Sequence, residues 1–499
     1  MTIRGWREAQ GETTITTQVV VVGSGPGGAA VSRALAERGA EVWILEEGPP
    51  RPRFRPNAAH TNRYHMQENG MMVAQGTGFM PIAAGRGVGG GSLVNSALSF
   101  RTPDDVLHGW RDVLDGDDRY GPTTMRPIFD ELEALLGIAI TPERIAGENS
   151  LLIVRGAKKL GLHASLAPRN TPYCSGCGIC NFGCPTGGKA SVDRNLIPMA
   201  QEHGATVQAD VKVDTILVEE GRAVGVTGEV RHTDTREPMG RLTVRADKVI
   251  VACGGIGTPR LLHTAGVAER MGDRVGRGLH VHPGSAVLGL CDHEVHMWRG
   301  ATQGAYFEDP RLPGVLPHTM SAPPGPLLLM LGTAGEGAKA AMSDLARLCG
   351  CVVMISDHGE GRVRATSDGR AKIEYWFDED DIGRIKAGME VTARVLLEGG
   401  AHTLLAPVAG IGRHTRIETF AAALADRAIG DFALYASHPM ASCRMGADPS
   451  ASVVGVDAQA HHLPGLYIAD SSVFPTSLGV NPQLTTMALG TAIGQRIPL

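Results

Sequence analysis

The sequence lacks an excess of either charge, a basic segment and a long apolar run. Its 47 Lys and Arg residues against 52 Asp and Glu residues give a formal net charge of −5, whereas proteins that bind nucleic acid through charge carry a basic surface. No basic block indicates attraction to an anionic membrane. The apolar run Leu327–Leu331 is far too short to span a bilayer. We therefore expect no nucleic-acid partner and no transmembrane segment.

The N-terminal segment lacks the apolar stretch of a secretory signal. It reads MTIRGWREAQGETTIT and is mostly polar, so we expect no signal peptide and a cytoplasmic protein. The nine cysteines are an odd number, which argues against a disulfide framework and for reduced thiols or metal ligation. A chain of 499 residues with 43% apolar and 20% charged residues is typical of a globular protein with two or three domains.

The sequence does contain a dinucleotide-binding pattern over Gln18–Glu47. Val19–Val22 predict a strand buried on both faces of a parallel sheet. The segment Gly23–Gly28 fits G-x-G-x-x-G, a turn that lets the backbone approach a pyrophosphate at the N-terminus of the next helix. A second strand ends in Glu46, whose carboxylate can accept the ribose hydroxyls of an adenine dinucleotide. The turn alone would be weak evidence, but the complete unit favours a dinucleotide site.

A second glycine-rich stretch, Gly85–Asn95, reads GRGVGGGSLVN. Its backbone N–H groups can cradle another part of a large cofactor. The alternative is a flexible surface loop, which we consider weaker because regular structure resumes directly at Ser92. A third strand–glycine turn–helix passage, Cys253–Leu262, could face the same ligand.

Four cysteines form a C-x2-C-x2-C-x3-C-P run, at Cys174, Cys177, Cys180 and Cys184. This is the spacing of iron–sulfur ligands in bacterial ferredoxins, where the fourth cysteine serves a second cluster. Only one such run exists here, so Cys184 folds back, a scattered cysteine completes the site, or the cluster has three irons. Structural zinc is the main rival, and unligated thiols are the third interpretation. We favour the iron–sulfur cluster.

The pattern of the chain changes between residues 286 and 430. Cys351–Ile355 predicts a buried strand, and Arg362–Ala365 and Ala371–Phe377 predict two more. The segment Asp380–Leu397 predicts a long helix. Strands joined by turns and covered by a helix are typical of an antiparallel sheet in a separate domain. We therefore expect an α/β fold with an α+β second domain.

Six motifs follow one another in a fixed order along the chain. After the opening unit they read GRGVGGGSLVN, ACGGIGTPRLL, VGRGLHVHP, SHPMASCRMG and LYIADSSVFPTSLGVNPQLTTMALGTAIG. Together they resemble the glucose–methanol–choline (GMC) oxidoreductases. The segment MISDHGEGRV and the cysteine run are most similar to the long-chain alcohol oxidase branch. The resemblance implies a flavoprotein with a Rossmann-like FAD-binding domain and a substrate domain built on an antiparallel sheet covered by helices.

The resemblance also implies a division of the chain. The FAD-binding domain is expected to comprise 1–100, 190–285 and 460–499, and the substrate domain 101–189 and 286–459, with a cysteine-cluster insertion at 171–189.

The cofactor contacts are likewise implied by the resemblance. Covalent members carry a histidine just before the asparagine of the second glycine loop, and Val94 stands there in this chain, so we expect dissociable FAD. The implied contacts are Gly23, Gly25, Gly28 and Glu46 for the ADP half, Gly90, Ser92 and Asn95 near the pyrophosphate or isoalloxazine, Val213 for adenine, and Asp470 for the ribityl or pyrophosphate region.

Alcohol oxidation needs an acceptor for the hydroxyl proton, and His438 suits that role because imidazole titrates near working pH. Asn481 can orient the substrate oxygen, and its amide followed by Pro482 is also a strong helix start. Either residue could instead be structural. His280 and His282 could line the site, although we expect them to be structural.

The sequence therefore predicts FAD-dependent oxidation of a small-molecule alcohol to an aldehyde or ketone by hydride transfer to flavin N5. Electrons would leave through the iron–sulfur cluster to an external acceptor or an electron-transfer protein, which would make the enzyme a dehydrogenase. The alternatives are an oxygen-using oxidase with a structural metal site, a flavin-holding lyase, and an electron-transfer protein in which the cluster is the working centre.

Overall fold

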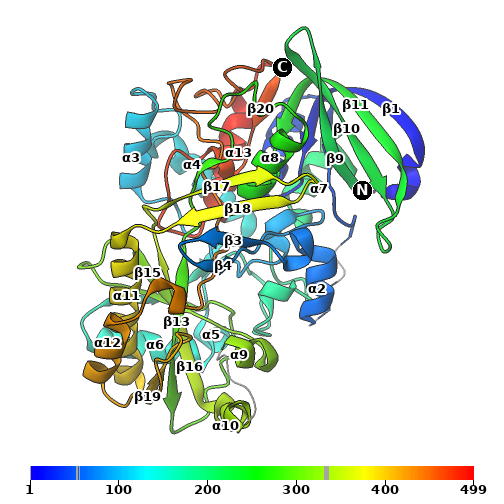
Figure 1. The fold of residues 1–499 in the computed structure, drawn as a ribbon. Helices are drawn as coiled ribbons and strands as arrows, with labels where there is room; N and C mark the ends of the chain where they lie inside the picture. Colours follow the sequence, from blue (N-terminus) through cyan, green and yellow to red (C-terminus); the bar gives the residue numbers. More distant parts are fainter. Residues whose placement is uncertain (1, 52–53, 56, 331–335) are drawn as a thin grey trace.

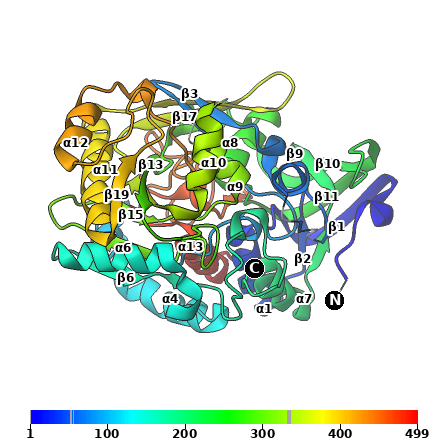
Figure 2. The same ribbon diagram turned by 90° about the horizontal axis from the view of Figure 1, so that it is seen from below.

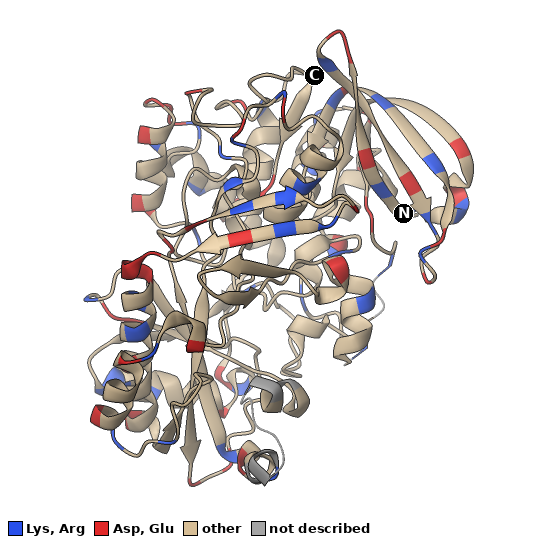
Figure 3. Cartoon of the chain, viewed as in Figure 1, with Lys and Arg blue, Asp and Glu red and all other residues tan. Residues whose placement is uncertain are grey.

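The computed structural model describes residues 2–51, 54–55, 57–330 and 336–499, which form three sheets of five or more strands (Figure 1). Leu331, the last residue of the apolar run, lies outside the described residues. Within the described part of the chain, no helix combines the length and apolarity that a membrane span needs. Lys and Arg are interspersed with Asp and Glu on the elements seen in Figure 3.

The first sheet has seven strands in the order β8-β2-β1-β11-β10-β9, with β20 paired to β11 beside this path. Strand β1 is parallel to β2 and to β11, whereas β10 is antiparallel to both of its neighbours. The strands are β1 (Gly11–Val22), β2 (Val42–Leu45), β8 (Thr206–Gln208), β9 (Val211–Glu219), β10 (Arg222–Arg231), β11 (Pro238–Val251) and β20 (Leu466–Ile468).

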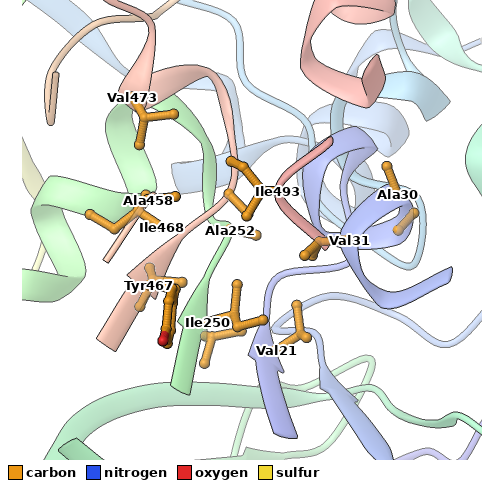
Figure 4. Packing of buried hydrophobic residues seen from close by; sticks show 14 of the residues in the cluster. Val21, Ala30, Val31, Ile250, Ala252, Ala458, Tyr467, Ile468, Val473 and Ile493 are labelled. Atoms are coloured by element: carbon orange, nitrogen blue, oxygen red, sulfur yellow. The ribbon is translucent and has the colours of Figure 1, made fainter. Parts of the chain in front are cut away.

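The parallel part of this sheet is buried because helices cover it. Val19–Val22 are at most 5% exposed, as the uniform valine run predicts. Helix α1 (Pro26–Glu37) packs against α13 (Gln483–Arg496) and α7 (Leu196–Glu202), and all three lie together in Figure 2. Figure 4 shows Val21, Val31, Ile250 and Ile493 in this core. The expected Rossmann-like arrangement is confirmed.

The second sheet is antiparallel throughout, in the order β19-β13-β16-β15-β14-β6. Every residue of β13 and β16 is buried, because α11 (Glu379–Gly399) packs on the central strands and against α6 (Glu148–Lys159) and α12 (Ile417–Ala425). This confirms the expected antiparallel sheet with helical cover. The strands are β6 (His163–Leu166), β13 (Gly284–Cys291), β14 (Ala305–Glu308), β15 (Val315–Thr319), β16 (Leu348–Ile355) and β19 (Ala401–Leu405).

The third sheet, in the order β12-β17-β18-β3-β4, lies between the other two in Figure 1. It joins β3 (Val73–Gly76) and β4 (Phe79–Pro81) to β17 (Glu360–Ala365) and β18 (Ala371–Trp376), with β12 (Arg277–Leu279) at its edge. We expected β3 and β4 in the FAD-binding domain and β17 and β18 in the substrate domain. Pairing between distant segments has no local signature, so this shared sheet was not foreseen.

The domain boundaries stay a prediction, but the packing departs from them in one segment. Helices α3 (Asp104–Val113) and α4 (Pro122–Leu136) were expected in the substrate domain. Their apolar residues, among them Trp110 and Phe129, belong to the core of the first sheet. The apolar stripe of an amphipathic helix shows that one face is buried, but it does not show which surface covers that face.

The remaining helices and strands are short. They are α2 (Ala58–His65), α5 (Glu143–Ala146), α8 (Gly254–Thr264), α9 (Pro324–Met330), α10 (Glu336–Asp344), β5 (Ala139–Ile140) and β7 (Pro168–Arg169).

Candidate active site

One cavity of about 540 Å³ is lined by residues of both the first and the second sheet. Its volume is within the range of small-molecule and cofactor pockets. Its wall contains segments of the first sheet, the second glycine loop and the second domain. All of the predicted cofactor-binding and catalytic residues except Gly28 line it: Gly23, Gly25, Glu46, Gly90, Ser92, Asn95, Val213, His438, Asp470 and Asn481.

The first glycine turn opens the N-terminus of α1 to the cavity. Gly25 caps this helix with extended backbone and no side-chain hydrogen bond, so the helix dipole and free N–H groups are available to an anion. Gly28 lies behind the turn, where a Cβ would come within 2.0 Å of the Gly23 carbonyl oxygen. Its role is therefore close packing of helix on strand, which the G-x-G-x-x-G pattern also requires.

The two glycine loops meet through their backbones. Gly90 has a φ of +52°, and a Cβ on it would lie 2.7 Å from the Gly25 Cα. The Ser92 hydroxyl donates to the Gly89 carbonyl at 2.7 Å and accepts from the Val192 N–H at 3.1 Å. Ser92 therefore fixes the loop, and its hydroxyl already has two protein partners.

Glu46, the predicted ribose ligand, is buried, and both of its carboxylate oxygens already accept hydrogen bonds from protein groups. Its Oε2 accepts from the N–H and hydroxyl of Ser24 at 3.1 and 2.6 Å, and its Oε1 accepts from the N–H groups of Gly48 and Gly87, each at 3.0 Å. Burial raises the pKa of this carboxyl group. A carboxylate offers about four lone-pair sites, so a ribose contact would have to displace one of these bonds. Glu47 also lines the cavity, 3.5 Å from Arg260.

Asp470 and Asn95 also hold protein groups in place. Asp470 accepts from the N–H of Gly254 at 2.8 Å and the hydroxyl of Thr258 at 2.6 Å, both in α8, and burial raises its pKa. The Asn95 amide donates to Gln483 at the start of α13. These side chains therefore tie the cavity wall to two helices.

The predicted catalytic pair is together in the cavity. Asn481 Nδ2 lies 3.1 Å from His438 Nε2, and Asn481 Oδ1 is buried without a hydrogen-bond partner among the described residues. Helix α13 begins at Gln483 with Pro482 as N-cap, so Asn481 is not itself the cap. Burial and the neighbouring rings of His282 and His318 hold the pKa of His438 well below its usual range.

No motif in the sequence points to His318, and we expected His282 to be structural. Both line the cavity. His282 Nδ1 lies 3.3 Å from His438 Nδ1, with the rings nearly perpendicular. His318 lies in β15, in a segment with no recognised motif, and only strand pairing brings it to the site.

The four cysteines of the run line a second, small cavity of about 10 Å³, the size of about one water molecule. Cys180 is buried, whereas Cys177 is exposed. No three of the four Sγ atoms lie within 4.8 Å of one another. Four thiolates at about 2.3 Å from one zinc ion would be about 3.8 Å apart, so the sulfurs are spaced more widely than a single zinc ion needs.

Lys189 connects the two cavities. It is 1% exposed and lines the cysteine cavity. Its ammonium donates to the carbonyl oxygens of Leu93 and Asn95, both at 2.9 Å, in the second glycine loop. Burial lowers the pKa of Lys189 to about 8. Cys180 lines the small cavity and its neighbour Asn181 lines the large one, so the cavities are adjacent.

A Rossmann-type sheet whose glycine turns open into a cavity that also contains a histidine–asparagine pair defines a dinucleotide-dependent oxidoreductase. The cavity fits FAD, because the uncapped N-terminus of α1 opens into it and Gln67 Oε1, a buried side-chain oxygen in its wall, has no partner within the described part of the chain. The chain belongs to the GMC oxidoreductases, which are FAD-dependent enzymes: models of this family match residues 63–284 and 357–490.

Comparison with known proteins agrees with this assignment. An uncharacterized GMC-type oxidoreductase of Mycobacterium tuberculosis is 32% identical over 98% of this chain and 77% of the relative. A long-chain-alcohol oxidase of Arabidopsis thaliana is 27% identical over 97% of this chain and 67% of the relative. The crystal structure of pyridoxine 4-oxidase from Mesorbium loti has a TM-score of 0.75 at 16% identity and covers 96% of this chain and 99% of that one, which supports the fold.

Proposed function

We propose that the protein oxidises the CH–OH group of a small alcohol to an aldehyde or ketone. The observation that carries this proposal is the His438–Asn481 contact at 3.1 Å, in the wall of the same cavity that both glycine loops line. When bound, FAD supplies the acceptor for the hydride of the carbinol carbon. His438 and Asn481 would hold the substrate oxygen.

The hydroxyl proton would leave to a histidine of this cavity. The sequence assigns that role to His438, and this assignment stays a prediction. A neutral imidazole can accept a proton, and burial keeps the His438 ring neutral at pH 7 by lowering its pKa. The Asn481 amide would orient the oxygen, since its own oxygen is buried without a partner among the described residues.

We favour a moderately apolar alcohol as substrate. The lining of the cavity includes Ile82, Leu98 and Met354, and burying apolar substrate surface against such side chains is favourable. The relatives named as long-chain-alcohol oxidases support the same substrate class.

The FAD would be held without a covalent bond. Val94, just before Asn95, lines the cavity and offers no nucleophilic atom at the position where covalent members carry histidine. Denaturing the purified holoenzyme in acid should release all of its flavin into the supernatant. Flavin that stays with the precipitated protein would contradict this proposal.

The cysteine run would hold an iron–sulfur cluster that passes electrons from the flavin site to an external acceptor. The adjacency of Cys180 and Asn181 in the two cavity walls favours this role, and the absence of three mutually close sulfurs among these cysteines suits a cluster of several irons better than one zinc ion. The cavity of about 10 Å³ between the cysteines does not hold such a cluster as the side chains stand, so loading would have to move them. Metal analysis and the visible spectrum of anaerobically purified protein distinguish iron with sulfide from zinc or an empty site.

Anaerobic mixing of the holoenzyme with primary alcohols tests the main proposal. Bleaching of the flavin band by an alcohol is expected, and His438→Ala should slow it by orders of magnitude while FAD stays bound. The matched control is His402→Ala, on the surface beside Asp292. A holoenzyme that no alcohol bleaches would instead favour a flavin-holding lyase.

A further inference from the structure

Three histidine rings line the cofactor cavity, and the proton positions on two of them follow from their partners. His318, in β15, is 2% exposed. Its Nδ1 lies 3.1 Å from the carbonyl oxygen of Leu316. A carbonyl oxygen only accepts, so Nδ1 carries the proton. Burial lowers the pKa of His318 to about 4, so the ring is neutral at pH 7. Its Nε2 therefore has a free lone pair.

His282 carries its proton on the same ring nitrogen, Nδ1, and donates it toward His438. The N–H of Gly479 donates to His282 Nε2 at 3.0 Å, so the proton of the neutral ring is on Nδ1. That nitrogen lies 3.3 Å from His438 Nδ1 and donates to it. Burial lowers the pKa of His282 to about 4, which keeps a second proton off Nε2 at pH 7.

The backbone around His282 is held rigidly in this orientation. His282 has a φ of +51°, a left-handed conformation that a non-glycine residue adopts at a cost. The buried carboxylate of Asp357 accepts from the N–H groups of Val281 and His282, at 2.8 and 3.3 Å. These bonds fix the backbone that carries the ring, and the hydrogen bond from the Gly479 N–H orients the ring itself.

These contacts determine the state of His438. Because His438 Nδ1 accepts from His282, the single proton of the neutral ring is on Nε2, the nitrogen next to Asn481. A ring with its proton there donates a hydrogen bond and does not accept a proton at that atom. The partnerless Asn481 Oδ1 is the acceptor that this N–H needs once the amide is turned, and the amide N–H groups of Asn481 then point to the cavity.

We propose that His318 Nε2, rather than His438 Nε2, accepts the hydroxyl proton, and that the Asn481 amide, held by the His438 N–H, donates a hydrogen bond to the substrate oxygen. This inference rests on the proposed alcohol oxidation. The substrate O–H bond breaks and an N–H bond forms at His318 Nε2, giving an imidazolium ring. The C–H electron pair leaves as hydride to the enzyme's flavin, which is the oxidant, and the C=O bond forms.

The titratable groups that act on this cluster are the three rings, Asp357 and His280. The buried Asp357 anion favours positive charge on His282 and His438, whereas His280 opposes protonation of His282, and His282 and His318 oppose protonation of His438. Protonation of His318 in acid should therefore inactivate flavin reduction, and this part of the pH profile should vanish when His318 is replaced.

The test is anaerobic flavin reduction in the FAD-loaded enzyme with a primary alcohol. His318→Asn can keep the donor to Leu316 and removes Nε2, and His318→Gln places a non-basic amide near Nε2. Both should slow reduction by about a hundredfold or more, the usual share of a general base, while FAD stays bound and substrate affinity changes little. Added imidazole should restore part of the rate in His318→Ala. His402→Gln is the surface control.

Reduction at the wild-type rate in both amide variants, with an unchanged pH profile, would overturn the role of His318 while leaving alcohol oxidation intact. A wild-type holoenzyme that no alcohol reduces overturns both proposals.

A second measurement needs neither variants nor substrate. Nitrogen-15 NMR of histidine-labelled holoenzyme should find Nε2 unprotonated in His318 and protonated in His438. The reverse pattern would return the proton-accepting role to His438.

Discussion

Replacing Asp357 with Asn should both destabilise the protein and slow flavin reduction, although this residue lines no part of the cofactor cavity. Asp357 is fully buried. Its Oδ2 accepts from the Val281 N–H and the Tyr375 hydroxyl, at 2.8 and 2.7 Å, and its Oδ1 accepts from the His282 N–H and the Ser477 hydroxyl, at 3.3 and 2.8 Å. The carboxylate therefore joins the turn that carries His282 to two other segments.

The size of the effect follows from what an amide nitrogen would face. The hydroxyls can rotate to accept from it, but a backbone N–H cannot. Either orientation of the amide leaves one buried N–H of residue 281 or 282 against another donor. An unsatisfied buried donor costs about 1–3 kcal/mol, and loss of a charge-assisted bond adds to this. We expect the free energy of unfolding to fall by about 2–4 kcal/mol at pH 7.

The stability difference between wild type and Asp357→Asn should depend on pH in a direction that follows from the pKa of Asp357. Burial alone would raise the pKa of Asp357, but His280, whose Nδ1 lies 3.4 Å from Oδ2, together with His282 and the Tyr375 hydrogen bond, holds it well below its ordinary value of 3.8. A carboxyl group with a lowered folded-state pKa stabilises the fold above its unfolded pKa, and this stability is lost as pH falls toward the folded-state pKa. The difference between wild type and Asp357→Asn should therefore shrink below about pH 4.

Chemical denaturation of the two holoenzymes at several pH values is the assay, with Asp292→Asn as the control, because Asp292 is 93% exposed. Flavin reduction should slow in Asp357→Asn because the His282 ring loses its fixed position. Equal stability of the variant and wild type at pH 7, together with an unchanged reduction rate, would refute the reasoning.

Three further changes test the cofactor side of the cavity. Gly90→Ala should weaken FAD binding by at least about tenfold, because a Cβ there would lie 2.7 Å from Gly25 at a φ of +52° and left-handed backbone alone costs an L-residue about 1–2 kcal/mol; Gly109→Ala, exposed in α3 with open space around its Cβ, is the control in a fluorescence titration. Lys189→Met should lower both the melting temperature and FAD affinity, since it leaves buried carbonyl oxygens of the second glycine loop without their donor; unchanged FAD affinity would show that the loop needs no such support. Glu46→Gln should lower the free energy of unfolding by about 1–3 kcal/mol, because the amide nitrogen would face backbone N–H groups from which the carboxylate accepts hydrogen bonds. A variant that loses FAD affinity without losing stability would restore the ribose role.

The first glycine turn and the His438–Asn481 pair could be predicted, because short stretches of the sequence carry the residues that define them. The run Val19–Val22 with the glycines after it predicts a buried strand and an open helix start, and the structure has β1 and α1 there. His438 and Asn481 were found through the short motifs around them, and they lie together in the cavity. Their catalytic roles stay predictions.

The partners of single side chains could not be predicted. Glu46 carries the expected acid of the second strand, yet its oxygens are occupied by three loops. The N-cap of α13 is Pro482 and not Asn481, because the competition between an Asn cap and a Pro cap depends on what surrounds the turn. Helices α3 and α4 pack on the core of the first sheet, which their sequence could not show, because a stripe of apolar residues does not reveal the surface that covers it.

The sequence by itself determined the class of the protein, since the spacing of its glycines sets where a backbone can turn and approach a cofactor. Only the tertiary structure decided how the histidines share their protons. His282, His318 and His438 come from three distant segments, and the proton on each ring follows from a partner that folding supplies: the Gly479 N–H, the Leu316 carbonyl oxygen and the next ring. A tautomer depends on which donor or acceptor lies within about 3 Å of the ring, and spacing along the chain carries no record of that distance.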